Sequence, residues 1–494
     1  MFRRHKKALN IYIRKLAAAA CACGMFLCGV LPASAVTEIE ARLEEQRAMP
    51  IQSNEVENWP VGPVVGAESA ILIEAKTGAI LYAKNIHKRE YPASTTKIMT
   101  ALLATELCEL DEVVSFSHDA VFDNPPGSSG IAMDVGQALT VEQCLNAILI
   151  RSANEVAFAV AEHISGTTDW TVFADLMNKR AAELGALDTH FTNPNGLPDE
   201  NHYTTAYDLA MMGRAFFDNE MLCQISLTRR MEIPASDRLP HTKLELNSMQ
   251  IIPTGAYAYE YIVGCKTGYT DDARCSLVSC AEKDGLKLIC AVLRDEDPFR
   301  YTDTIALFDY GFANFQKVNI SQADTRYDID NMGLFYSEND ILGDSQPFLA
   351  LDRDDYIIFP MTASMEDLDS SISYETEDEE QAASITYSYH GMELGSVGVN
   401  FAKGGNEARL FGMVTGKDEA SLEDSAEPSV IFIDVSKILA FLAVAAVAVF
   451  IGLLLHSALK NYSFSGNSHK KRHEGGRHRD KRNRSGGKFK DYDL

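Results

Sequence analysis

The chain has 494 residues, 46% of them hydrophobic, which is enough to build a large core. It contains 70 Asp and Glu residues against 45 Lys and Arg residues, and its formal net charge at pH 7 is −25. So acidic a protein repels phosphate groups, and we therefore expect no nucleic-acid binding.

The N-terminal residues 1–35 are predicted to be a secretory signal peptide. A positively charged start precedes an apolar stretch, and Ala33-Ser34-Ala35 follows as a small-x-small cleavage site. The mature chain would then begin at Val36, and residues 36–65 would form a helical or loose lead-in. The alternative interpretation is an uncleaved N-terminal anchor.

Seven cysteines remain after this cleavage, and an odd number leaves at least one free thiol. They are scattered through apolar segments, which favours buried thiols over a disulfide framework. No Cys or His spacing is typical of a zinc site, so we expect neither a metal nor a cofactor.

Residues 66–315 are predicted to form one domain of mixed type. A strand–turn–strand about Gly78 opens it, helical periodicity fills its middle, and strands rich in Val, Leu, Ile and Cys return near its end. A sheet built from both ends of a domain, with helices inserted between, predicts an α/β/α sandwich with an antiparallel sheet. We expect helices over Ser94–Cys108, Val141–Ile150, Glu155–Ile164, Trp170–Leu184, Thr205–Phe217 and Thr302–Phe315, and strands over Tyr261–Lys266, Arg274–Glu282 and Lys287–Arg294.

The C-terminal part of the chain has a different character. Residues 316–427 carry short alternating segments and Gly-rich turns, which predict a small β-rich stalk domain. Residues 438–455 are 18 consecutive apolar residues, long enough for one transmembrane helix. A buried core helix is the alternative, but both flanks are polar. The tail over 456–494 is basic, so the positive-inside rule places it in the cytoplasm and the large domain outside.

Three short motifs follow one another in the mixed domain: Ser94-x-x-Lys97, Ser152-x-Asn154 and Lys266-Thr267-Gly268. Each pattern recurs elsewhere, for example at Ser457 and at Lys76, so a single match is weak evidence. Only this set puts the first motif on a helix, the second before another helix and the third at a strand. That order is typical of a serine acyl-transfer site.

The first two motifs supply a nucleophile, a base and a proton relay. A serine hydroxyl is a weak nucleophile, and Lys97, one helical turn after Ser94, is the candidate base. A lysine acts as a base only when its pKa falls toward neutrality, through burial or a second cation such as Lys266. Ser152 is the candidate relay to the leaving amine, and Asn154 is expected to hold Lys97 and a substrate amide.

The third motif is predicted to bind the substrate. Lys266 is expected to attract a carboxylate, with the hydroxyl groups of Thr267 and Thr270 beside it. Gly268 would allow a peptide backbone to approach the strand closely.

The backbone N–H groups of Ser94 and Tyr269 are the candidate oxyanion hole. Each of these residues also has a plainer interpretation. The serines could cap helices, Lys97 could be solvated, and the Lys-Thr-Gly could form a hairpin turn. Their joint order and context favour the catalytic interpretation.

With these motifs the chain resembles the low-molecular-mass penicillin-binding proteins, the serine D-Ala-D-Ala carboxypeptidases of peptidase family S11, over about residues 66–430. The stretches Asn193–Leu197 and His202–Leu209 add to the likeness. The resemblance implies a β-lactamase- and transpeptidase-like fold and removal of the terminal D-Ala from peptidoglycan pentapeptide stems. It also implies an acyl-enzyme on Ser94 and covalent inhibition by β-lactams.

The resemblance also implies a bacterial membrane protein with its catalytic domain outside the cytoplasm. Relatives often end in an amphipathic anchor, whereas a single-pass span is expected here. Arg300, placed before the closing helix, stands where relatives carry a basic residue near the substrate carboxylate. Tyr269 stands where some relatives have His, which matters little if only its backbone is used.

Three other functions stay open at the level of sequence. A serine β-lactamase shares the motifs, and Glu142–Asn146 has the letters of a class A water-activating segment, but it precedes Ser152. A D,D-endopeptidase or transpeptidase of the same family, which cuts or joins cross-links, is not excluded by the sequence. A wall-binding scaffold with a silent site is disfavoured because every motif residue is present.

Overall fold

The computed structural model describes residues 38–324, 349–375 and 381–401. The predicted signal peptide (1–35), transmembrane segment (438–455) and basic tail (456–494) lie outside the described residues. Within the described ranges, no helix is both long enough and apolar enough to cross a membrane.

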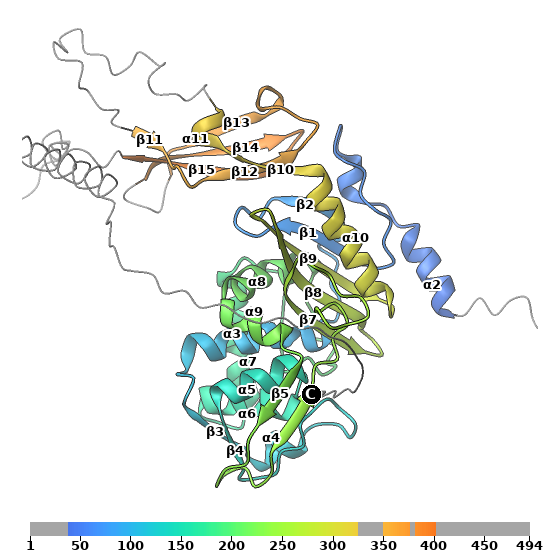
Figure 1. Cartoon of the computed structure of the whole chain (residues 1–494), viewed down its shortest axis with the longest axis vertical. Helices are drawn as coiled ribbons and strands as arrows, with labels where there is room; N and C mark the ends of the chain where they lie inside the picture. Colours follow the sequence, from blue (N-terminus) through green and yellow to red (C-terminus); the bar gives the residue numbers. More distant parts are fainter. Residues whose placement is uncertain (1–37, 325–348, 376–380, 402–494) are drawn as a thin grey trace, which may run out of the picture. The chain divides into compact units, whose positions relative to one another are not determined.

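A five-stranded antiparallel sheet is the centre of the fold (Figure 1). Its strand order is β2-β1-β9-β8-β7, so two early strands lie beside three late ones. This topology confirms the predicted α/β fold with an antiparallel sheet made from both ends of the region. The strands are β1 (Ser69–Glu74), β2 (Ile80–Lys84), β7 (Ile262–Thr270), β8 (Arg274–Lys283) and β9 (Leu286–Asp295).

Both faces of the sheet are covered. In β1, Ile71 and Ile73 belong to one hydrophobic cluster, whereas Ala70 and Leu72 belong to another. Because successive side chains of a strand point to opposite faces, the two clusters lie on opposite sides of the sheet. The helix α8 (Ala206–Asp218) contributes to the first cluster, and α10 (Phe299–Asn314) contributes to the second.

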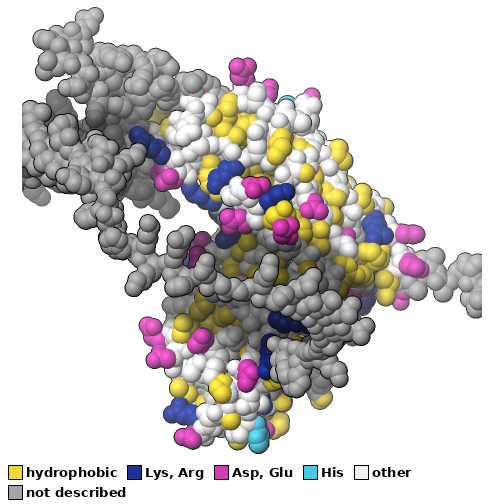
Figure 2. Space-filling model, viewed as in Figure 1, with side chains coloured by type: hydrophobic (Ala, Val, Ile, Leu, Met, Phe, Trp, Pro, Cys, Tyr) yellow, Lys and Arg dark blue, Asp and Glu magenta, His cyan; other side chains and the backbone are white. Residues whose placement is uncertain are grey.

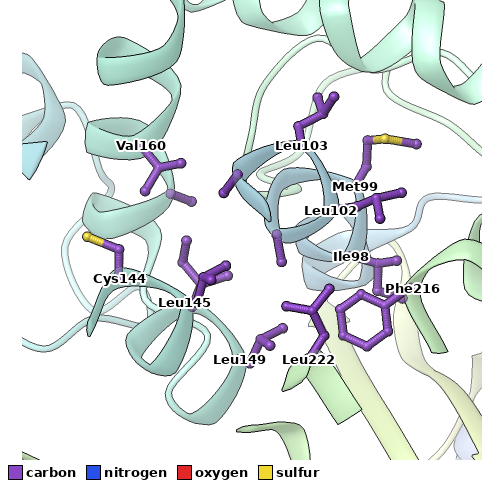
Figure 3. Packing of buried hydrophobic residues seen from close by; sticks show 14 of the residues in the cluster. Ile98, Met99, Leu102, Leu103, Cys144, Leu145, Leu149, Val160, Phe216 and Leu222 are labelled. Carbon is purple, nitrogen blue, oxygen red and sulfur yellow. The ribbon is translucent and has the colours of Figure 1, made fainter. Parts of the chain in front are cut away.

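The helices between β2 and β7 build the larger of these clusters. Figure 3 shows Ile98 and Leu102 of α3 together with Leu145 of α5 and Val160 of α6, all of them buried. The predicted helices between residues 141 and 217 are confirmed to within one residue at each end. All the helices between β2 and β7 are α3 (Lys97–Leu107), α4 (His118–Phe122), α5 (Val141–Ile150), α6 (Asn154–Ser165), α7 (Trp170–Glu183), α8 and α9 (Glu220–Leu227), with the 3₁₀ helix η2 (Ala93–Thr96) before α3.

Two predicted boundaries were wrong, and both matter for the site. The strand β7 runs four residues beyond its predicted end at Lys266, because Thr267–Thr270 pair with β8 in register. The helix α10 begins at Phe299 rather than Thr302, so Arg300 lies in its first turn and not before it.

Smaller elements complete the described structure. After α10 the described elements are mostly strands, and residues 402–427 of the predicted β-rich domain lie outside the described residues. On the face that Figure 2 shows, acidic and basic side chains are interspersed over the described residues. The remaining elements are α2 (Glu38–Arg47), η1 (Gln52–Glu55), β3 (Val113–Ser115), β4 (Ala138–Thr140), β5 (Arg230–Ile233), β6 (Lys243–Leu246), β10 (Phe315–Asn319), α11 (Ile320–Ala323), β11 (Leu349–Leu351), β12 (Tyr356–Pro360), η4 (Met365–Asp367), β13 (Asp369–Ser373), β14 (Gln381–Tyr389) and β15 (Met392–Phe401).

Candidate active site

Ser94 and Lys97 lie at the junction between η2 and α3. The sequence predicts one continuous helix here, but the first turn is a tight 3₁₀ turn, entered through Ala93 at a φ of +48°. Ser94 is half-buried and Lys97 is fully buried. The Nζ atom of Lys97 lies 3.0 Å from the Oγ atom of Ser94, so the predicted nucleophile and base are in direct contact.

The amine of Lys97 has two further neighbours, Oδ1 of Asn154 and the backbone oxygen of Asn195, each at 2.7 Å. Burial lowers the pKa of Lys97 well below its ordinary value, the nearby charge of Lys266 lowers it further, and Glu155 opposes both. A neutral amine has two hydrogens and one lone pair. The two carbonyl oxygens can only accept hydrogen bonds, so they take both hydrogens and leave the lone pair for the hydroxyl of Ser94.

The Ser152-x-Asn154 motif contacts the Lys266-Thr267-Gly268 motif through the side chains of Ser152 and Lys266. The Nζ atom of Lys266 donates to Oγ of Ser152 at 3.1 Å and to the backbone oxygen of Thr267 at 2.7 Å. Burial lowers the pKa of Lys266 to about 7, and the charge of Arg300 contributes in the same direction, against the opposing effect of Cys265. Ser152 itself has a φ of +55°, a conformation that costs a non-glycine residue about 1–2 kcal/mol.

The strand β7 passes directly against the turn that carries Ser94. A Cβ atom at Gly268 would lie 2.7 Å from the backbone oxygen of Pro92 and 3.1 Å from the backbone nitrogen of Ser94. Glycine is therefore required here for close approach. This approach brings the β7 backbone next to the N–H of Ser94, where the oxyanion hole is predicted together with the N–H of Tyr269.

The other predicted binding residues occupy the same strand and its neighbour. Tyr269 is 53% exposed and its hydroxyl donates to Asp271, so its side chain reaches solvent. The Thr270 hydroxyl accepts from the backbone of Ala273 in the β7–β8 turn, which leaves its proton for a ligand. Thr267 is half-buried. Arg300 reaches the backbone oxygen of Gly268 at 3.5 Å and also pairs with Asp297 at 3.2 Å.

The loop that contains Asn195 and Gly196 completes the site. The chemistry of its residue types did not predict this role. Asn195 supplies the backbone oxygen for Lys97, and the neighbouring Gly196 presses against the backbone oxygen of Ala93. His202 bonds Thr96 at 2.8 Å, and burial lowers its pKa to about 3, so it is neutral. The Asn-Pro-Asn-Gly sequence indicates a turn, but nothing in it shows that the turn lies beneath a catalytic lysine.

Comparison with known proteins gives a consistent picture. The sequence matches the family model described as D-alanyl-D-alanine carboxypeptidase over residues 56–297. It is 35% identical over 257 residues to D-alanyl-D-alanine carboxypeptidase DacF of Bacillus subtilis, covering 51% of this chain and 63% of that protein. It is 30% identical over 323 residues to D-alanyl-D-alanine carboxypeptidase DacA of Escherichia coli K12, and this match covers 63% of this chain and 75% of that protein.

A solved structure supports the fold. Penicillin binding protein 5 from Haemophilus influenzae superposes with a TM-score of 0.54 at 24% identity. The match covers 69% of this chain and 98% of that one.

We expect Gly196→Ala to destabilise the protein far more than Gly185→Ala. Both glycines have positive φ (+84° and +82°), so the backbone strain of about 1–2 kcal/mol is common to both variants. Only at position 196 does the new Cβ meet another group, the backbone oxygen of Ala93 at 1.8 Å, which adds about 1–3 kcal/mol of overpacking. Urea unfolding measures the difference, and equal losses in the two variants would contradict the tight packing of this loop.

Proposed function

Since the chain belongs to the D-alanyl-D-alanine carboxypeptidase family and is a serine-type enzyme of that activity, we propose that Ser94 is its nucleophile. The substrate is the D-Ala-D-Ala end of a peptidoglycan pentapeptide stem. The observation that carries this proposal is the position of the buried Lys97 amine, 3.0 Å from Oγ of Ser94 with both of its other neighbours carbonyl oxygens. Such an amine accepts the serine proton as the hydroxyl attacks.

Acylation begins when Oγ of Ser94 attacks the carbonyl carbon of the penultimate D-Ala. The proton moves to Nζ of Lys97, and the negative charge on the carbonyl oxygen is stabilised by the N–H groups of Ser94 and Tyr269. The close approach of Gly268 to the backbone nitrogen of Ser94 supports this pairing of donors. The stem peptide lies beside β7 in the manner of an added strand.

Ser152 then relays a proton to the nitrogen of the leaving D-alanine: its own hydroxyl proton passes to that nitrogen and is replaced by the proton that Lys97 took from Ser94. Lys266 donates a hydrogen bond to Oγ of Ser152, so the hydroxyl proton of Ser152 is free to point toward the amine. Water hydrolyses the acyl-enzyme and restores Ser94. Lys266 and Arg300, both beside Gly268, attract the terminal carboxylate, and Asn154 holds a substrate amide as well as Lys97.

The β-lactamase alternative has less support than the carboxypeptidase. Glu142, the residue that matches the class A pattern, is exposed on α5. Its backbone oxygen accepts a hydrogen bond from the side chain of Asn146. Glu142 is thus solvated, whereas Lys97 is fully buried. We therefore expect penicillins to form a long-lived adduct that is released slowly.

We also propose that residues 438–455 anchor the protein in the bacterial cell membrane after removal of residues 1–35. The run of 18 apolar residues and the basic segment after it support a single pass with the C-terminus in the cytoplasm. The catalytic region then faces the cell wall, where stem peptides are found.

Ser94→Ala is expected to abolish labelling by fluorescent penicillin and to lower D-Ala release by about a thousandfold or more, because the covalent intermediate cannot form. The matched control is Ser457→Ala, which removes the serine of a second Ser-x-x-Lys sequence and should change neither. Mass spectrometry of the labelled peptide locates the adduct. An adduct that persists in Ser94→Ala would show that another residue is the nucleophile.

The value of kcat/KM is expected to fall as the pH rises through about 7. Lys266 binds the carboxylate only when charged, and since its pKa is lowered to about 7 the charged form is lost above that pH. The decline should approach about tenfold per pH unit. Arginine stays charged, so Lys266→Arg should have a lower but flatter alkaline profile. A wild-type profile that is flat from pH 6 to about 9 would contradict this role.

A chain that ends at residue 430 is expected to leave the membrane fraction. It lacks the apolar run that holds the intact protein in the bilayer, and no described helix replaces it. Fractionation of cells followed by penicillin labelling measures the distribution of both forms. Equal membrane retention of the two forms would place the anchor elsewhere.

A further inference from the structure

Three side chains with metal-binding groups meet at the far end of α3 from Ser94. Cys108 caps the C-terminus of α3, Glu112 follows in the next turn, and His163 lies in the last turn of α6. One ligand atom from each lies within 4.8 Å of the other two, and Oε2 of Glu112 is 2.8 Å from Nε2 of His163. We propose that Cys108, Glu112 and His163 form a zinc site, with a water molecule as the fourth ligand.

The carboxylate of Glu112 is held in place before any metal arrives. Its Oε1 atom accepts from the backbone nitrogen of Glu109 at 2.7 Å, and its own backbone nitrogen donates to the oxygen of Glu109 at 3.2 Å. The backbone oxygen of Glu112 accepts from Val141 at the start of α5. A backbone donor on one oxygen orients the other toward the imidazole, which is how metal-binding carboxylates are commonly positioned.

Cys108 differs from the other cysteines of the described residues. Six of them are buried, whereas Cys108 is only partly buried. Zinc binding replaces the thiol proton, which passes to solvent as the sulfur–zinc bond forms, and no oxidation is involved.

The donor set and spacing fit zinc better than a hard cation. Sulfur, imidazole nitrogen and one carboxylate oxygen suit Zn²⁺, whereas Mg²⁺ and Ca²⁺ take oxygen ligands. Zinc–ligand distances of about 2.0–2.3 Å in a tetrahedron separate ligand atoms by roughly 3.3–3.6 Å. The hydrogen bond between His163 and Glu112 therefore opens slightly, and Cys108 moves inward by little more than about 1 Å.

The site joins two helices that are also joined at the catalytic centre. Lys97, the first residue of α3, bonds Asn154, the first residue of α6, at 2.7 Å. Cys108 and His163 lie at the opposite ends of the same helices, about 16 Å from Lys97 and about 14 Å from Asn154 at 1.5 Å per residue. A metal there ties α3 to α6 without touching the substrate, so it should stabilise the fold and leave the chemistry unchanged.

The test uses the purified full chain, stripped with a chelator and then incubated with Zn²⁺ alone. Zinc content, thermal unfolding and the rate of Cys108 alkylation, resolved by peptide mass spectrometry, are measured for the wild type, Cys108→Ser and His163→Ala. His118→Ala is the matched control, because His118 is also a helical histidine beside a carboxylate, that of Asp119, at 3.4 Å. It corrects for adventitious binding, including that by tail histidines.

We expect zinc to slow Cys108 alkylation at least tenfold in the wild type and in His118→Ala but not in His163→Ala. The wild type and His118→Ala should each retain one zinc ion more than Cys108→Ser and His163→Ala. Only the wild type and His118→Ala should gain thermal stability when zinc is added. Equal zinc content in all four proteins, or an alkylation rate that zinc does not change, would overturn the proposal. If Cys108→Ser fails to fold, protection of the wild-type thiol still decides the matter.

Discussion

The burial of one lysine amine determines how the site must be built. Lys97 is fully buried, and a charged ammonium in that position would have lost its water while its hydrogen-bond partners are all uncharged. The neutral amine is instead satisfied by Asn154 and by the backbone of Asn195, and its lone pair is left for Ser94. These partners come from three separate segments, so the base exists only once all three have folded together.

Holding those segments at such short range requires unfavourable backbone conformations. Ala93 and Ser152 both have positive φ, and each costs about 1–2 kcal/mol for a non-glycine residue. Strain of this kind persists only where the surroundings fix it, and it is common at active sites. Here the surroundings are the buried side chains of α3, α5 and α6, so the helical core in Figure 3 also keeps the catalytic turns in place.

The sequence predicted the sheet, the helices between residues 141 and 217 and the contacts among the three motifs, because each depends on local periodicity or on residue types with a defined chemistry. It did not predict the role of Asn195, which acts through a backbone oxygen that any residue possesses. The extension of β7 was missed because Thr267–Thr270 are fixed by pairing with β8 rather than by their own apolar pattern. Contacts made by backbone atoms across the fold leave no signal in the spacing of residue types.

The cluster of Cys108, Glu112 and His163 is another contact that residue spacing did not reveal. Its position also explains why a metal bound there would not disturb catalysis. Metal ligands are usually recognised when several lie within a few residues of one another, but His163 is separated from the other two by all of α5. The three side chains meet because α3 and α6 run side by side from a shared hydrogen bond at their first residues. The hydrogen bond between Lys97 and Asn154 joins the two helices at their first residues. Zinc bound by Cys108 and His163 would join them at the opposite ends and leave the amine of Lys97 where it is.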